Sequence, residues 1–154
     1  MSVNVRVMRC SPEDVFAVLA DGWVFPVWVV GASRMRNVDD AWPDVGSKLH
    51  HSFGVWPLLI NDDTTVVELV APHHFVMQPK GWPMGEARVI VDIKPHRSGC
   101  VVRIEEFALS GPATFVPKFL LNVGLYLRNV ETLHRLAYIA EGRMQSNITS
   151  NKQS

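Results

Sequence analysis

The hydrophobic pattern of this chain changes its period once, and that change limits the folds available to it. From Ser33 to Leu109, short runs rich in β-branched and aromatic residues alternate with turn residues, which predicts a meander of about six strands. After Gly111, apolar residues recur at steps of three and four over about 28 residues, which predicts one long amphipathic helix. We expect the buried stripe of this helix to contain Phe119, Val123, Tyr126, Val130, Leu133, Ala137 and Ala140.

The N-terminal segment adds a strand and two short helices. Alternating valines predict a strand over Ser2 to Arg9 with one buried face. Ser11 as N-cap and Pro12 at the first helical position then predict the start of a helix. The apolar segment GWVFPVWVVGA is too short to cross a membrane and predicts a second short helix or a tight turn.

The composition predicts one domain without a nucleic-acid partner. Of the 154 residues, 47% are hydrophobic, which supplies a core for a single domain over 1–144, followed by a flexible tail over 145–154. The 15 basic and 15 acidic residues cancel, which argues against binding to phosphate backbones. No signal peptide or membrane span is apparent, and Cys10 and Cys100 are the only cysteines. We therefore expect a cytoplasmic monomer without a disulfide.

The hairpin EARVIVDIKPHRSGCVVRIEEFAL carries two adjacent glutamates, Glu105 and Glu106, of which one must face inward. Pairing Asp92 with Arg103 avoids like charges across the hairpin, whereas a slip of two residues creates them. This register places Glu105 on the outer face and Glu106, opposite Val89, on the inner face. A carboxylate in a dry core is costly, so we expect a water-accessible cavity beside Glu106.

The same alternation in SKLHHSFGV turns a histidine inward. It places Leu49, His51, Phe53 and Val55 on the inner face. An inward carboxylate and an inward imidazole among apolar and aromatic residues fit a ligand pocket better than a solid core.

The order of elements resembles the helix-grip fold of the START-like polyketide cyclase/dehydrase (SRPBCC) superfamily. The segments LADGWVFPVWVVGASRMRNVD, WPDVGSKLHHSFGVWPLLINDDT, KGWPMGEA, SGPATFVP and LRNVETLHRLAYIAEG are similar to an actinobacterial, polyketide cyclase-like branch. The resemblance implies an α+β fold in which a curved antiparallel sheet of about seven strands wraps around the long helix and encloses a hydrophobic cavity. It implies no particular reaction, because this fold hosts carriers, receptors, co-chaperones and cyclases.

Several residues are candidates for contact with a ligand in such a cavity. Glu106 and His51 are candidates to orient polar ligand groups or, in an enzyme, to transfer protons. The alternatives are a wet pocket rim for Glu106, a satisfied interior position for His51, and loop sealing for the tryptophans. We place Arg128, Asn129 and Glu131 on the outer face or at the ends of the helix. The expected ligand contacts are Trp28, His51, Phe53, Trp56, Trp82, Val89, Val91, Ile104, Glu106, Asn122 and Tyr126.

Three functions fit these observations. The first is binding of a small hydrophobic molecule of aromatic, polyketide-like or lipid-like type; the second is an aromatase/cyclase; the third is a co-chaperone-like protein-binding module. No nucleophile motif or phosphate-binding loop is present, and the histidines lack convergent metal spacing, so we expect neither cofactor nor metal. The facing of Arg34 and the roles of His50, His73 and His74 stay undecided.

Overall fold

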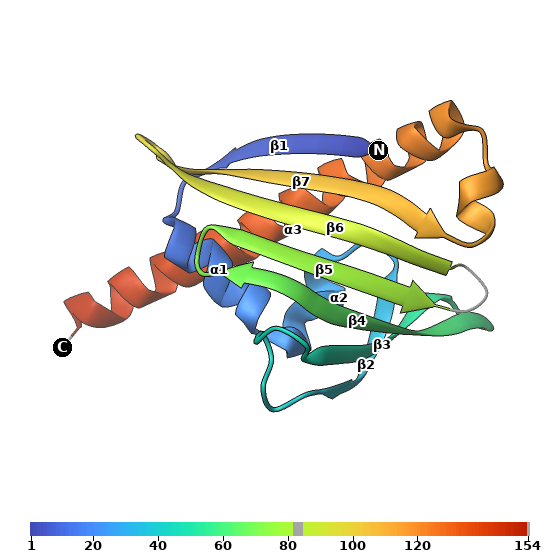
Figure 1. Cartoon of the computed structure of the whole chain (residues 1–154). Coiled ribbons are helices and arrows are strands. Elements are labelled where there is room, and N and C mark those ends of the chain that lie inside the picture. Colours follow the sequence, from blue (N-terminus) through green and yellow to red (C-terminus); the bar gives the residue numbers. More distant parts are fainter. Residues whose placement is uncertain (82–84, 154) are drawn as a thin grey trace.

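The structure is a computed structural model that describes residues 1–81 and 85–153, and it confirms the α+β helix-grip fold (Figure 1). One antiparallel sheet of seven strands has the order β1-β7-β6-β5-β4-β3-β2. Its strands are β1 (Ser2–Met8), β2 (Ala32–Val38), β3 (Lys48–Val55), β4 (Leu58–Val70), β5 (His74–Gly81), β6 (Gly85–His96) and β7 (Gly99–Ser110). The helices are α1 (Pro12–Ala20), η1 (Gly22–Val24), α2 (Phe25–Trp28), η2 (Pro112–Phe115) and α3 (Lys118–Lys152).

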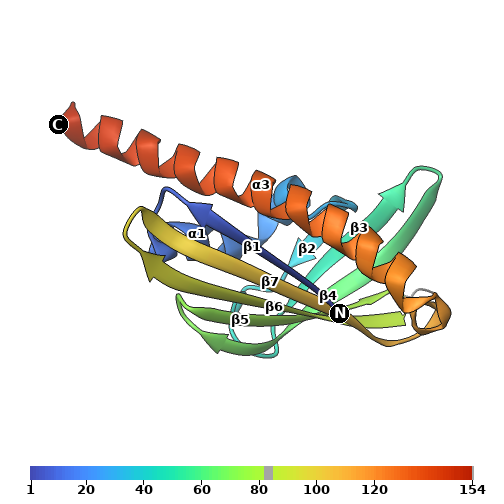
Figure 2. The same ribbon diagram turned by 90° about the horizontal axis from the view of Figure 1, so that it is seen from above.

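Helices α1, α2 and α3 lie on one face of the sheet. Figure 2 shows α3 crossing this face, with its C-terminal end projecting past the strands. Helices α1 and α2 pack against α3 on the same side. Because α3 continues to Lys152, it includes most of the segment 145–154 that the sequence predicts as a tail.

Helix α1 begins where the sequence predicts. The hydroxyl of Ser11 accepts a hydrogen bond from the Asp14 N–H, and the Asp14 carboxylate accepts one from the Ser11 N–H, which completes a capping box. The buried face of α1 then packs into the main core, where Phe75 contacts the rings of Phe16 and Trp42 edge to face. This core also takes in the middle of α3, from Leu133 to Ala140.

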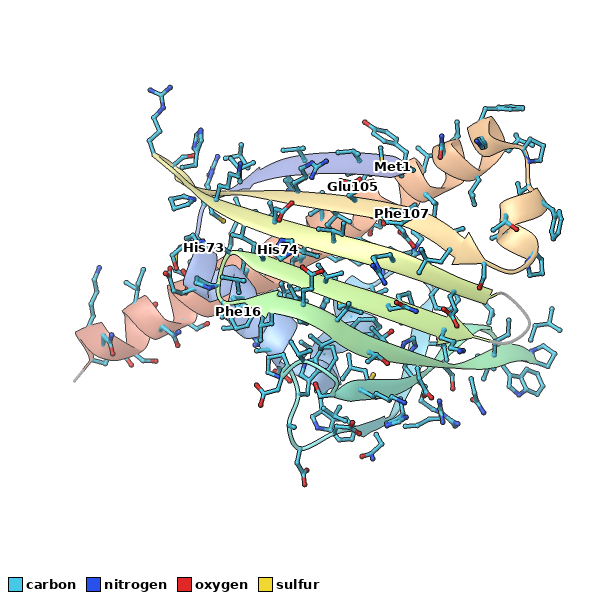
Figure 3. The ribbon with its side chains drawn as sticks, viewed as in Figure 1. Met1, Phe16, His73, His74, Glu105 and Phe107 are labelled. Atoms are coloured by element: carbon cyan, nitrogen blue, oxygen red, sulfur yellow. The ribbon has the colours of Figure 1, made fainter. Side chains whose placement is uncertain are left out.

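The predicted register of the β6–β7 hairpin is confirmed. Asp92 lies opposite Arg103 and Val89 opposite Glu106. Glu106 is 4% exposed on the inner face. Glu105 lies on the face turned away from the helices, where its carboxylate accepts a hydrogen bond of 2.6 Å from the Arg103 guanidinium (Figure 3).

Two predicted burial patterns are wrong in part. On α3, Leu133, Ala137 and Ala140 are buried, but the N-terminal half of the stripe (Phe119, Val123, Tyr126 and Val130) is 45–67% exposed. The reason is that this half of the helix turns a different set of residues, centred on Leu121 and Leu125, toward the sheet. Val55 is also exposed rather than inward, because it lies at the tip of the β3–β4 hairpin.

Four residues are undecided from the sequence alone, and all four lie outside the space between the sheet and the helices. They are Arg34, His50, His73 and His74. The two nitrogens of His50 contact Asp39 and Asp63 at 3.1 and 2.9 Å. His73 Nδ1 donates to the Ile93 carbonyl, and His74 contacts Asp92 on the outer face (Figure 3). The Arg34 side chain is exposed.

Candidate functional site

A cavity of about 240 Å³ lies between the sheet and the N-terminal half of α3. Strands β3 to β7 supply one wall and helices α2 and α3 the other. The volume is slightly below the range of about 300–1,000 Å³ that is common for drug-sized ligands. Most of the lining is apolar, and its larger side chains include Trp28, Phe25, Phe53, Phe107, Met77 and Leu125.

Small residues keep this end of the molecule hollow. Along the inner face of β7, Val102 and Ile104 belong to the packed core, Ile104 also borders the cavity, and Ala108 lines the cavity alone. Ala108 lies opposite Ala87 of β6, so two methyl groups stand where a core would place larger side chains. The cavity therefore follows from the sequence of these two strands.

Glu106 is held by a pair of side chains from α3. Its Oε1 accepts a hydrogen bond of 3.0 Å from the Arg128 guanidinium, and its Oε2 accepts one of 3.0 Å from the Asn129 amide. Arg128 also donates to the Val30 carbonyl at 3.0 Å and lies 5.5 Å from the centre of the Phe53 ring. The buried charge of Glu106 is thus compensated by a cation and an amide. Glu106 also lines the cavity.

The placement of Arg128 and Asn129 on the outer face or at the ends of the helix is wrong. Both line the cavity, on the face of α3 that also presents Leu125 and Thr132. Sequence reasoning missed them because it followed the more apolar stripe through Phe119. A second stripe runs through Leu121, Leu125, Arg128 and Thr132 at steps of four, three and four residues, and this stripe is the signal for the cavity face.

His51 is 1% exposed and lies beside the ring of Phe25, with ring centres 4.9 Å apart. Its Nε2 is 2.9 Å from the Thr64 hydroxyl, while Nδ1 has no hydrogen-bond partner among the described residues. Burial, together with the nearby Arg36 charge, lowers the pKa of His51 to about 4. The imidazole is therefore neutral at physiological pH.

Asp62 is a lining residue that the sequence analysis did not identify. Its Oδ1 is buried without a hydrogen-bond partner in the described part of the chain, and burial raises the pKa of this carboxyl to about 6. Gly81 leaves room for it, because a Cβ there would lie 3.2 Å from the Asp62 Cγ. The signal was the alternation of Asp62 with Thr64 and Val66, both 1% exposed, which gives all three the same face.

The structure brings about half of the expected ligand contacts together. The cavity is lined by Trp28, His51, Phe53, Val89, Ile104 and Glu106. Trp28 is 2% exposed, and its indole N–H has no partner among the described residues.

The other expected contacts lie elsewhere. Trp56 is 80% exposed beyond β3, and Val91 is fully buried in the main core. Asn122 Oδ1 accepts a hydrogen bond from the N-terminal amine, and Tyr126 is half exposed beside β1. Trp82 lies outside the described residues.

Within residues 1–81 and 85–153, no three His, Cys, Asp or Glu side chains are grouped closely enough to hold a metal ion. In the same ranges, none of the helices has both the length and the apolar character that a membrane crossing requires.

No protein-family model matches the chain, and no curated protein matches it. Solved structures do share its fold. Protein CV1439 from Chromobacterium violaceum is 18% identical, with 90% of this chain and 96% of that chain covered and a TM-score of 0.71. Two others are larger proteins. StfQ is a di-domain ARO/CYC from the steffimycin biosynthetic pathway; it is 15% identical, with 93% of this chain and 51% of that chain covered and a TM-score of 0.68. DynU16, from the dynemicin biosynthetic locus, is 13% identical, with 91% of this chain and 46% of that chain covered and a TM-score of 0.66.

The TM-scores establish a shared fold, and at sequence identities of 13–18% they establish the fold alone. Membership of the actinobacterial, polyketide cyclase-like branch stays a prediction.

Proposed function

We propose that this protein binds a small, largely apolar molecule of aromatic or polyketide-like type in the cavity between the sheet and α3. The cavity itself carries the proposal, since an apolar hollow with a few polar groups is typical of small-molecule sites. The likeness to StfQ and DynU16 supports it at the level of fold. Binding would be driven by removal of apolar ligand surface from water, at about 0.8 kcal/mol per buried CH₂ group.

The charges of the lining favour an uncharged ligand. Arg128 is the one cationic side chain among the described lining residues, and it is already paired with Glu106. The acids Asp62 and Glu86 also line the cavity, which disfavours a carboxylate. We therefore expect neutral aromatic compounds to bind better than fatty acids of similar size.

Filling the cavity should weaken the binding of a small aromatic ligand. The probe is 2-acetyl-6-methoxynaphthalene, an uncharged aromatic ketone, and the measurement follows backbone amide shifts during titration. In the unmodified protein, shifts should appear in the strands and helix that line the cavity. Ala108→Phe places a ring in the hollow end, and we expect it to weaken binding at least about tenfold, which corresponds to about 1.4 kcal/mol.

Val5→Phe is the matched control for this substitution. Val5 is 59% exposed on β1, so the same enlargement there leaves the cavity unchanged. Equal affinity of Ala108→Phe and the unmodified protein, or amide shifts confined to the outer face, would exclude the cavity as the binding site.

Proton transfer by Glu106 and His51, as in a cyclase, stays a prediction. Each Glu106 oxygen already accepts a hydrogen bond from α3, which supports a positioning role better than a role as base. Turnover of a poly-β-ketone substrate that survives both Glu106→Gln and His51→Ala would eliminate the pair as catalytic groups.

Protein binding is the second candidate, because the exposed stripe of Phe119, Val123, Tyr126 and Val130 presents apolar surface on α3. Val123→Glu adds a charge to this stripe without touching the cavity. The affinity for the naphthyl ketone should be unchanged in this variant. A loss of affinity would place the ligand on the stripe instead.

A further inference from the structure

Two buried polar atoms without partners lie on adjacent strands of the cavity wall. His51 of β3 and Asp62 of β4 are directly opposite each other in the antiparallel register, so their side chains share the inner face. Both residues line the cavity. His51 Nδ1 and Asp62 Oδ1 are each buried without a hydrogen-bond partner among the described residues. Buried polar atoms are normally satisfied, so this pair points to a missing partner.

The neighbours of the pair fix what that partner must offer. Thr64 holds His51 through Nε2 at 2.9 Å, and when its hydroxyl donates, the imidazole proton resides on Nδ1. His51 then presents a donor, and the ionised Asp62 presents an acceptor. A hydroxyl group satisfies both atoms together, because its O–H donates to the carboxylate while its oxygen accepts from the imidazole. A carbonyl or ether oxygen satisfies only the imidazole.

We propose that His51 and Asp62 form a hydrogen-bonding subsite for a hydroxyl group, and that the natural ligand is a hydroxylated aromatic compound. The inference rests on the proposed function and names the chemical class of ligand for that cavity. It assigns recognition to a pair that differs from the sequence-predicted pair, because Glu106 is occupied by Arg128 and Asn129.

The charged groups around Asp62 are consistent with this role. Asp63 follows it on β4 but pairs with Arg36 and His50 on the outer face. Arg128 of α3 is a cation whose charge acts weakly on Asp62, and it is paired with Glu106. A phenolic O–H can therefore approach the Asp62 carboxylate without breaking an ion pair.

The test compares two probes that differ by one methyl group. These are 6-acetyl-2-naphthol, which carries the hydroxyl, and 2-acetyl-6-methoxynaphthalene, in which a methyl ether replaces it. Calorimetric titration at pH 7.5 should show that the unmodified protein prefers the naphthol about tenfold, as expected when a buried donor and acceptor are both satisfied. Asp62→Asn and His51→Phe should each reduce this preference to about threefold or less.

Asp63→Asn is the matched control, since it makes the same change one residue along, on the outer face, and should keep the full preference. Equal affinity for the two probes, with binding still blocked by Ala108→Phe, would overturn the hydroxyl subsite and leave the proposed function standing. Failure of both probes to bind the unmodified protein would overturn both proposals. A preference that persists in Asp62→Asn and His51→Phe would place the hydroxyl elsewhere in the cavity and overturn the assignment.

Discussion

Arg128→Met should lower the free energy of unfolding by about 3 kcal/mol, because it leaves the buried carboxylate of Glu106 without its cation. The Glu106 side chain is 5% exposed, so solvent compensates little of the charge that the guanidinium neutralises. Asn129 alone would then hold the charge. Urea denaturation monitored by circular dichroism measures the change.

The opposite truncation should be milder. Glu106→Gln leaves Arg128 with 27% exposure, with the Val30 carbonyl and with the face of the Phe53 ring, and we expect a loss of about 1 kcal/mol. Joining Arg128→Met to Glu106→Leu should recover part of the stability lost in Arg128→Met, since no unpaired charge remains.

The same helix provides a control for the arginine substitution. Arg135 pairs with Glu131 at 2.8 Å on the exposed side of α3, and Arg135→Met should cost no more than about 0.5 kcal/mol. If Arg128→Met and Arg135→Met cost the same, the Glu106 pair would be energetically equivalent to a surface ion pair.

The fold was largely predictable from sequence because its elements have strong local signals. Capping at Ser11, alternation in the strands and charge pairing across the β6–β7 hairpin each point to one answer. The inward position of Glu106 followed from that hairpin, because register in a sheet with one buried face is strongly specified.

The site was less predictable, because its composition depends on which face of α3 meets the cavity. The stripe through Phe119 is the more apolar one, yet the helix buries it only from Leu133 onward. Periodicity finds apolar stripes and therefore passes over a face that includes Arg128 and Asn129. Asp62 was missed for a related reason, since a charged residue in a strand normally indicates the solvent face.

Asp62→Asn should stabilise the protein at neutral pH, although it removes a polar group of the proposed subsite. Burial raises the pKa of Asp62 to about 6, above its value in the unfolded chain. The folded state therefore binds the proton of the Asp62 carboxyl more tightly than the unfolded chain does. Its stabilising contribution is complete below about pH 4 and is lost as the pH rises through 6. Two pKa units correspond to about 3 kcal/mol, and the partial exposure of Asp62 reduces the expected gain to about 2 kcal/mol at pH 7.5.

Thermal and urea unfolding at pH 4 and pH 7.5 test this expectation. The two proteins should differ little at pH 4, where folded Asp62 is protonated, and by the full amount at pH 7.5. His51 acts in the opposite direction, because its lowered pKa of about 4 favours folding above about pH 6.5 and is lost as the pH falls through 4. His51 is present in both proteins, so its contribution cancels from the difference between them.

Asp63→Asn supplies the contrast. This substitution removes the carboxylate that contacts Arg36 and His50, so it should not increase the stability of the protein. An equal gain for Asp62→Asn at both pH values would assign the effect to packing rather than to charge. A pH-dependent gain, found together with the loss of preference for the naphthol, would show that Asp62 lowers stability while it improves recognition. Such a trade-off is the signature of a binding group rather than of a structural one.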